Sequence, residues 1–116
     1  MNKPKFSRYN DGMVSIYREK DQRSNFGARI SATSIRDMTF IAKLAFAEQS
    51  KRQQDIEFAE QRGFSLSMKI KTRHIRGVDN KCKAVIDGYL YDVSYVDATR
   101  SDLYLYLEGV DHVADD

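Results

Sequence analysis

The segment that decides the fold runs from Phe64 to Val110 and reads FSLSMKIKTRHIRGVDNKCKAVIDGYLYDVSYVDATRSDLYLYLEGV. Apolar and polar side chains alternate in three of its parts, with the period of two that is typical of strands with one buried face. Only short polar connections separate these parts. The segment therefore predicts a compact antiparallel meander.

The first two alternating parts predict a strand and a hairpin. In the first part, every second residue lies on the apolar face: Phe64, Leu66, Met68 and Ile70. In the second part, the pair Asp87-Gly88 suits a two-residue type I′ turn, because both central residues of that turn need a positive φ. The arms of this hairpin share one predicted core face: Cys82, Ala84, Ile86, Tyr89, Tyr91, Val93 and Tyr95.

The last alternating part predicts a strand from Leu103 to Val110. One face carries leucines and the other carries larger polar side chains: Leu103, Leu105 and Leu107 against Tyr104, Tyr106 and Glu108. With the leucines in the core, the two tyrosines point outward. There they either cover the sheet beneath another segment or supply contact area between subunits.

The first half of the chain predicts two further strands. Residues 12–18 place Val14 and Ile16 on one face, with polar and larger side chains on the other. Residues 39–47 also alternate, although their alanine content leaves a helix possible. The face that we expect to be buried there consists of Phe40, Ala42, Leu44 and Phe46.

A long loop and one helix complete the predicted elements. Residues 21–37 show no sustained period and predict the loop. Ser50 as N-cap and Gly63 at the C′ position bracket a polar helix of about twelve residues. Its apolar stripe is narrow, comprising Ile56, Ala59 and Phe58. Such a helix is marginal alone, so we expect it to rest on something outside its own domain core.

Composition indicates one soluble globular domain made in the cytoplasm. The chain has 116 residues, of which 41% are hydrophobic and 31% charged. No apolar run approaches the ~20 residues of a membrane span, and the first residues lack the apolar core of a secretory signal. Cys82 is the single cysteine, so no internal disulfide can form. Its place in an alternating pattern favours a buried small hydrophobe over a nucleophile.

The charge distribution is uneven although the formal net charge is only +2. Residues 62–83 contain seven basic residues and one acid, whereas residues 84–116 contain eight acids and one arginine. Lys69, Lys71 and Arg73 share one strand face. These residues could form an ordinary solvated face, meet nucleic-acid phosphates, or meet the acidic side of an identical neighbour in a head-to-tail ring.

The sequence favours a protein that is not an enzyme and binds no cofactor or metal. His74 and His112 are the only histidines, and neither stands at metal-ligand spacing from the other or from Cys82. Asp55 and Glu57 are two apart on the predicted helix and so lie on different faces, which is unsuitable for an acid-base pair. The sequence also lacks a Gly-rich phosphate loop.

The order of segments resembles the phage head-tail joining family, also described as head closure, stopper or head-tail adaptor proteins. The order is a strand, a long loop, a strand ending in Ala-Phe-Ala, a polar Gln-rich helix, a strand ending Lys71-Thr72-Arg73-His74, a hairpin and an apolar final strand. In that family an aromatic residue followed two positions later by an aliphatic one commonly follows the hairpin turn, as Tyr91 and Val93 do here. Phe40 stands near the place of a tryptophan that is often found in the family.

The resemblance covers residues 12–110 and implies a mainly β fold, a small antiparallel β-barrel of about six strands with one short helix and a long loop. It leaves residues 1–11 as an extended N-terminal arm and residues 111–116 as an acidic C-terminal tail. The implied function is that of a structural virion neck protein. The implied partners are further copies in a homo-oligomeric ring, portal and adaptor proteins above it, tail-terminator or tail proteins below it, and packaged DNA in its channel.

The resemblance also assigns expected roles to particular residues. The predicted channel or gate residues are Lys51, Arg52, Gln53 and Gln54. The predicted subunit-interface residues are Lys69, Lys71, Arg73, Asp102, Tyr104 and Tyr106. Contact with a neighbouring ring is expected at Phe26, Arg29 and Ile30.

Two other functions fit the same sequence. A tail terminator or another tail component would share the fold and the ring. A nucleic-acid-binding β-barrel would use cations against phosphates and tyrosines against bases. Its cations would be Lys69, Lys71, Arg73, Arg76, Lys81 and Lys83. The acidic last third opposes this function unless the two charged regions lie well apart.

Overall fold

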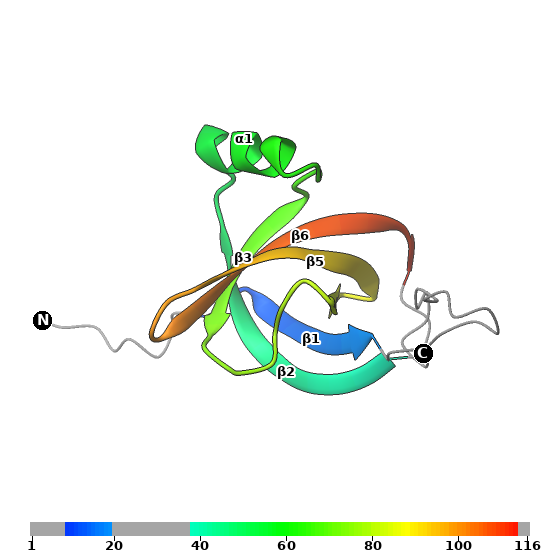
Figure 1. The fold of residues 1–116 in the computed structure, drawn as a ribbon. Coiled ribbons are helices and arrows are strands. Elements are labelled where there is room, and N and C mark those ends of the chain that lie inside the picture. Colours follow the sequence, from blue (N-terminus) through cyan, green and yellow to red (C-terminus); the bar gives the residue numbers. More distant parts are fainter. Residues whose placement is uncertain (1–8, 20–37, 114–116) are drawn as a thin grey trace, which may run out of the picture.

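A computed structural model of the chain describes residues 9–19 and 38–113, with the side chains of 111–113 left out. The described residues form six strands and one helix (Figure 1). The elements are β1 (Gly12–Glu19), β2 (Met38–Gln49), α1 (Gln53–Gln61), β3 (Met68–Arg73), β4 (Cys82–Ile86), β5 (Tyr89–Ala98) and β6 (Asp102–Val113). The strands close into one antiparallel barrel, so the predicted fold class is confirmed.

The order of strands around the barrel is β1-β2-β3-β6-β5-β4, with β4 returning to β1. β4, β5 and β6 form the predicted meander, but the place of β3 in it is wrong. β3 pairs with β6 through Met68 to Arg73 against Leu107 to Asp102, and it does not lie beside β4. Closing the sheet in this way gives β3 a strand neighbour on both sides, which removes the open edge that a simple meander would leave.

The core is formed by side chains that every strand directs into the barrel. Its buried members are Val14, Ile16, Leu44, Phe46, Ile70, Cys82, Ala84, Ile86, Val93, Leu103, Leu105 and Leu107. Thr72 is fully buried among them, and its hydroxyl donates to the carbonyl of Arg73 at 3.0 Å. The predicted inward faces of β1, β4 and β6 are confirmed.

The prediction for β2 fails at Phe40, which is 55% exposed. The register between β1 and β2 shifts by one residue between Ile16 and Tyr17, so Tyr17 pairs with Phe40. An extra residue in one strand turns the following side chains to the opposite face. Phe40 therefore lies outside the barrel, with its ring 5.5 Å from the ring of Tyr17.

Irregularities also change the predicted faces of β5 and the predicted start of β3. The ladder between β5 and β6 shifts twice, and Tyr89 is exposed while Leu90 is buried. β3 begins at Met68, so Phe64 and Leu66 precede the strand. Strict alternation in sequence gave the strand positions but not these local breaks.

The predicted hairpin turn is confirmed. Asp87 has φ of 52° and Gly88 has φ of 82°, as a type I′ turn requires. Ile86 and Tyr89 flank the turn as the first pair of the β4–β5 ladder.

The helix begins later than predicted, because Arg52 rather than Ser50 occupies the N-cap. Gly63 has φ of 83° just after the helix, so its predicted C′ position is confirmed. At the other end of the chain, β6 continues to Val113, three residues into the predicted tail. The predicted neighbouring-ring residues Phe26, Arg29 and Ile30 lie outside the described residues, as do positions 1–8 and 114–116.

Candidate functional site

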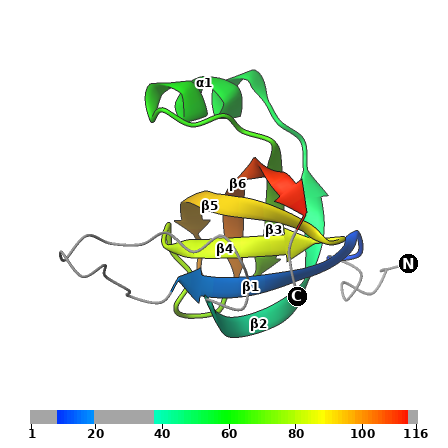
Figure 2. The same cartoon turned by 90° about the vertical axis from the view of Figure 1, so that its right-hand side faces the viewer.

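The candidate site is the helix α1 and the sheet face beneath it. Figures 1 and 2 show α1 raised above the barrel, connected to it by the end of β2 and by residues 62–67. Only Asp55 and Ala59 of the helix are buried, and Phe58 is half-buried. The contacts of these residues with the outer face of β3, β6 and β5 therefore position the helix on the barrel.

A polar contact, which we name the α1 latch, consists of Asp55, Lys69 and Tyr106. Lys69 Nζ lies 3.1 Å from Asp55 Oδ1, and the Tyr106 hydroxyl donates to the same oxygen at 3.3 Å. The second carboxylate oxygen accepts the backbone N–H of Arg52 at 3.0 Å. One carboxylate thus caps the helix N-terminus and ties the helix to β3 and β6.

The latch favours the charged forms of its ion pair. Burial by itself raises the pKa of Asp55, but hydrogen bonds from the Arg52 backbone and from Lys69 outweigh it, so this pKa is lowered. Burial opposes the charge of Lys69, yet the bonds to Asp55 and Tyr106 raise its pKa. The pKa of the Tyr106 phenol is raised, chiefly by burial. At neutral pH the latch is therefore a carboxylate, an ammonium and a neutral phenol.

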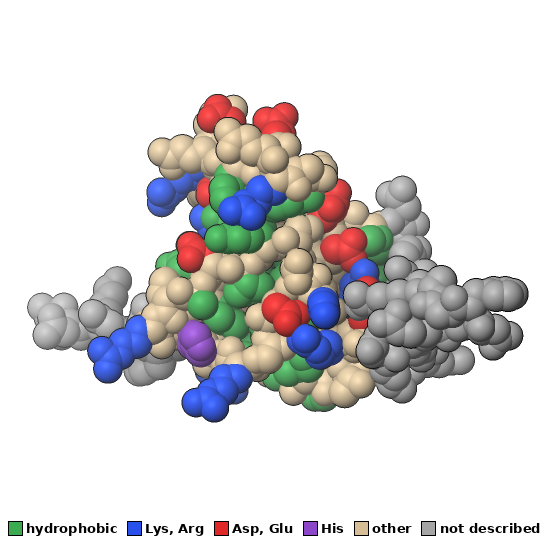
Figure 3. Space-filling view, viewed as in Figure 1, with side chains coloured by type: hydrophobic (Ala, Val, Ile, Leu, Met, Phe, Trp, Pro, Cys, Tyr) green, Lys and Arg blue, Asp and Glu red, His purple; other side chains and the backbone are tan. Residues whose placement is uncertain are grey.

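An aromatic cluster beside the latch completes the attachment. The rings of Phe58 and Tyr95 are 4.8 Å apart, and Tyr106 packs on both, at 5.6 Å and 5.4 Å respectively. The guanidinium of Arg62 lies over Phe58 and Tyr95, at 4.6 Å and 4.9 Å from their ring centres. Figure 3 shows apolar side chains gathered between the helix and the barrel. The helix thus rests on its own barrel, which corrects the expectation that it rests on something beyond its domain core.

The predicted channel residues lie together at the N-terminal end of α1, and all four are exposed. Lys51 Nζ donates to the carbonyl of Ser67 at 3.2 Å. The Gln53 amide donates to Glu57 one turn along the helix at 3.3 Å. Their role toward a channel stays a prediction.

The structure separates the six predicted interface residues into two groups. Tyr106 is only 7% exposed and Asp102 only 6%. Of the two alternatives for the outward tyrosines, Tyr106 therefore follows the first, because it covers the sheet beneath another segment, the helix α1. Asp102 accepts hydrogen bonds from the hydroxyls of Tyr9 and Ser101. Lys69 is held in the latch. These three are occupied within one molecule. Of the other three, which lie on the outer face of β3 and β6, Arg73 is exposed and Lys71 and Tyr104 are half-buried.

Opposite charges that the sequence keeps apart meet on this face. Lys71 pairs in register with Tyr104, and Tyr104 pairs in turn with Asp97 of β5. A groove of about 230 Å³ nearby is lined by Gln49, Arg52, Lys69, Asp97 and Tyr104. The outer face of β3, β6 and β5 therefore carries both signs of charge. Contact of the basic residues with the acidic side of a neighbour stays a prediction.

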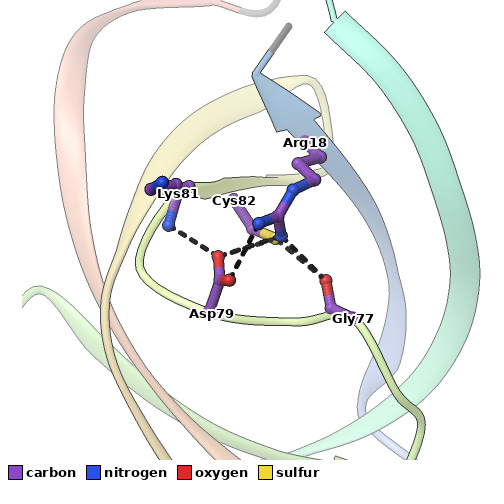
Figure 4. Close-up of polar contacts among 5 residues, drawn as sticks. All are labelled: Arg18, Gly77, Asp79, Lys81 and Cys82. Atoms are coloured by element: carbon purple, nitrogen blue, oxygen red, sulfur yellow. Dashed lines mark hydrogen bonds and ion pairs between the residues drawn. The ribbon is translucent and has the colours of Figure 1, made fainter. Parts of the chain in front are cut away.

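Two further basic side chains, Lys83 and Arg18, are also paired with acids inside the molecule. Lys83 pairs with Asp92 and, at 3.1 Å, with Glu19, and these bonds raise its pKa against the opposing effect of burial. Arg18 holds both oxygens of Asp79, at 3.1 Å and 3.0 Å (Figure 4). The hydrogen bond and the charge of Asp79 raise the pKa of Arg18. These pairs fix β1 to β4, β5 and the loop before β4.

Cys82 belongs to this second network and is buried, as predicted. Its Sγ lies 3.6 Å from the Gly77 carbonyl and 3.9 Å from the Arg18 guanidinium (Figure 4). Burial raises the pKa of the thiol, which disfavours the reactive thiolate. Among the described residues, no group of three or more His, Cys, Asp or Glu side chains could hold a metal ion. No described helix is long and apolar enough to cross a membrane.

The sequence did not predict that Asp55 and Tyr95 take part in the contact between α1 and the barrel. The spacing of Asp55 and Glu57 excludes an acid-base pair but says nothing of the contacts of Asp55. Its place three residues after Arg52, at the start of a polar helix, is the spacing of a residue that caps its own helix through its carboxylate. That spacing could have identified it. The alternation predicts Tyr95 on the core face, because the irregularity between Val93 and Tyr95 is not visible in the sequence.

In comparisons with known proteins, no protein-family model and no curated protein matches this chain.

Proposed function

We propose that this chain is a ring-forming structural protein of a phage neck. In this role it completes the head below the portal and adaptor, retains the packaged DNA and offers a platform to the tail. One observation carries the proposal: a closed six-strand barrel with a polar helix inserted between β2 and β3. This is the arrangement that the resemblance to head-tail joining proteins implies.

The position of α1 supports the proposal. A ring that closes a channel needs an element that projects from a rigid body, and α1 projects from a closed barrel by a small set of contacts. Its exposed end carries two cations and two amides, at Lys51, Arg52, Gln53 and Gln54. These side chains suit the phosphates of DNA without reading its bases.

The outer face of β3 and β6 is the part of the barrel that we assign to contacts between copies. Arg73 is exposed there and Lys71 and Tyr104 are half-buried, with Asp97 close by. A face that carries both signs of charge and an amphipathic ring suits contact with a protein surface of mixed charge.

The distribution of ion pairs weakens the nucleic-acid-binding alternative. Of the six cations that it requires, Lys69 is neutralised by Asp55, and Lys83 by Glu19 and Asp92. Asp97 also lies on the same face as Lys71 and would repel a phosphate backbone. A continuous basic surface is what such binding needs.

The deciding experiment locates the chain in particles. Particles released by cells that carry this gene are purified on a density gradient, and mass spectrometry counts the copies of the chain per particle. A neck ring predicts a small fixed copy number, antibody labelling where head meets tail, and tailless heads that lose DNA when the gene is deleted. Absence of the chain from particles would refute the proposal. Labelling at the far end of the tail, or along it, would favour a tail component instead.

Binding to DNA fragments at several salt concentrations distinguishes the neck protein from the nucleic-acid-binding barrel. A neck protein outside its ring should bind weakly at physiological salt. Tight binding of the isolated chain with a steep salt dependence would favour the nucleic-acid-binding barrel.

A further inference from the structure

Strand β5 is paired over only part of its length on one side. It spans Tyr89–Ala98, but β4 pairs with it only from Tyr89 to Asp92. On the opposite side, β6 pairs with it up to Ala98. The edge of β5 from residue 93 to 98 therefore has no strand beside it in the described part of the chain.

The hydrogen-bond pattern shows which backbone groups this edge presents. The N–H of Thr99 donates to the carbonyl of Asp102 at 2.9 Å, so these two residues form a hydrogen-bonded pair. In an antiparallel ladder such pairs alternate with pairs whose N–H and C=O groups point the other way. By this alternation Val96 and Ala98 direct their backbone groups away from β6. Among the described residues, no hydrogen bond reaches these groups, and open strand groups of this kind are matched by a second extended backbone.

A groove of about 530 Å³ lies beside this edge. One wall is β5, and the other is the loop between β3 and β4. Val96 on the first wall and Val78 on the second are both half-buried, and both pack against the core of the barrel. Each wall thus offers an apolar side chain that an occupant of the groove could cover.

The groove is also lined by a cation that lacks a counter-charge. The guanidinium of Arg62 lies over Phe58 and Tyr95, at 4.6 Å and 4.9 Å from their ring centres. Arg62 is exposed, and no carboxylate of the described residues pairs with it. Stacking on two rings fixes the plane of the guanidinium and leaves its N–H groups free for a carboxylate.

The acids near the groove do not cancel this charge. Asp79 is the only acid among the residues that line the groove, and Arg18 already holds both of its oxygens (Figure 4). Asp97 lies in β5 itself, but it lines the other groove, beside Tyr104. The groove therefore favours an occupant that brings a carboxylate over one that brings a cation.

The sequence of this chain outside the described residues does not supply such an occupant. Residues 1–8 carry three cations and no acid, and residues 20–37 carry four cations and two acids. Residues 114–116 include two acids, but three residues are too few to cover the edge from 93 to 98. A different protein is thus the source that the charges favour.

We propose that this groove binds an extended segment of a different protein as an added β-strand, and that apolar and acidic residues alternate in this segment. Successive side chains of a strand point to opposite faces. The apolar side chains of the segment share the face of Val96 and cover Val78. Its acidic side chains share the face of Tyr95, where Arg62 binds them. Backbone hydrogen bonds to Val96 and Ala98 hold the segment to β5.

The test titrates the full ¹⁵N-labelled chain with the synthetic peptide Ac-SVEVEVS-NH2 and follows the binding by NMR. Strand addition predicts shifts and slowed hydrogen exchange at the amides of Val96 and Ala98. The control peptide Ac-SVKVKVS-NH2 has the same apolar pattern and the opposite charge, and it should bind at least tenfold more weakly. Equal affinity for the two peptides would overturn the role of Arg62 in selecting the partner.

Two N-methylated forms of the acidic peptide test the backbone contact. One form carries N-methyl groups on its three valines, and the other carries them on its two glutamates and its last serine. An added strand turns only one of these sets toward β5: the valines in antiparallel addition and the glutamates in parallel addition. One form should therefore lose binding and the other should keep it. The same affinity for both forms would refute strand addition.

A charge exchange in the groove completes the test. Arg62→Glu should weaken binding of the acidic peptide at least tenfold and strengthen binding of the lysine peptide. Lys43→Glu, on the exposed side of β2, is the matched control and should leave both affinities unchanged. If Arg62→Glu fails to fold, Arg62→Gln serves instead and should abolish the preference for the acidic peptide. A preference that survives the loss of the guanidinium would contradict the proposal.

Two results on the wild-type chain would also overturn the proposal. One is the absence of binding at about 1 mM acidic peptide. The other is slow hydrogen exchange at Val96 and Ala98 without peptide, which would show that this chain or a second copy already covers the edge. Strand addition does not depend on the neck function, since a chain that is missing from phage particles could still bind the peptide. The two proposals can therefore fail separately.

Discussion

Lys69 Nζ lies 3.1 Å from Asp55 Oδ1, and this contact joins the helix α1 to strand β3. The two side chains are only 15% and 11% exposed, so most of the pair is removed from water. Such a pair is costly to break from one side, because the remaining charge stays buried without its counter-charge. One carboxylate thus makes the polar part of the contact between the helix and the barrel.

Replacing Asp55 by Asn should loosen the helix. The substitution keeps the shape of the side chain but leaves Lys69 without its counter-charge, and we expect a loss of about 1–3 kcal/mol in the free energy of unfolding. Urea unfolding followed by circular dichroism measures it. Glu60→Gln, on the exposed side of α1, is the matched control and should change the value by less than about 0.5 kcal/mol. Equal stability of the two variants would show that the latch does not hold the helix.

The same pair predicts how stability depends on pH. The pKa of Asp55 is lower in the folded state than its ordinary value of 3.8, so its contribution is complete above that value and disappears as the pH falls through the folded pKa. The pKa of Lys69 is raised above 10.5, so its contribution is complete below 10.5 and disappears as the pH rises through the folded pKa.

The stability difference between the wild-type chain and Asp55→Asn should therefore be largest between about pH 4 and 10 and decrease on both sides. Unfolding in urea at a series of pH values measures this difference directly. Other titrating groups, such as Asp79, are common to both proteins and largely cancel. A difference that is constant from pH 2 to 7 would contradict the assignment.

The aromatic cluster should contribute separately from the latch. Phe58→Ala removes a half-buried ring from Tyr95 and Tyr106, and we expect a loss of about 1–2 kcal/mol. The change should also expose apolar surface on the barrel, so a dye that binds such surface should fluoresce more strongly. Phe58→Leu is the control and should retain most of the stability. An unchanged dye signal for Phe58→Ala would mean that the helix is not held by this cluster.

The strand content could be predicted from the sequence because a period of two survives wherever one face is buried. β4 and β6 illustrate this, since Ala84 and Leu105 are fully buried as expected. The turn at Asp87-Gly88 was equally predictable, because few residue pairs accept two positive φ values. The position of β3 beside β6 was not predictable, because pairing over some thirty residues of sequence leaves no local signal.

The site was predicted less well, because most of it depends on tertiary contacts. The pattern placed Tyr106 outside the barrel, which is right, but it could not show that α1 covers it. Likewise the charge count of residues 62–83 indicates a basic region, yet Lys69 is neutralised by Asp55 of α1 and Lys83 by Glu19 of β1 and Asp92 of β5, which all lie outside that region. Charge that is counted along a chain does not reveal which charges remain accessible.

The accessible part of the predicted interface gives the last prediction. Lys71→Glu together with Arg73→Glu should reduce incorporation of the chain into particles at least tenfold while leaving the monomer folded, because both side chains lie on the outer face of β3 and neither is in the latch. Quantitative mass spectrometry of purified particles and circular dichroism of the free chain measure the two effects.

Lys69→Glu is the contrasting variant. It places a second acid against Asp55 and should lower the stability of the free chain by about 3 kcal/mol or more, so any loss of incorporation would follow from unfolding. Lys43→Glu, on the exposed side of β2, controls for the reversal of one charge on another face of the barrel and should be incorporated normally. Normal particles from the Lys71 and Arg73 double variant would exclude this face as a contact between copies, because reversed charges at a subunit interface cost several kcal/mol.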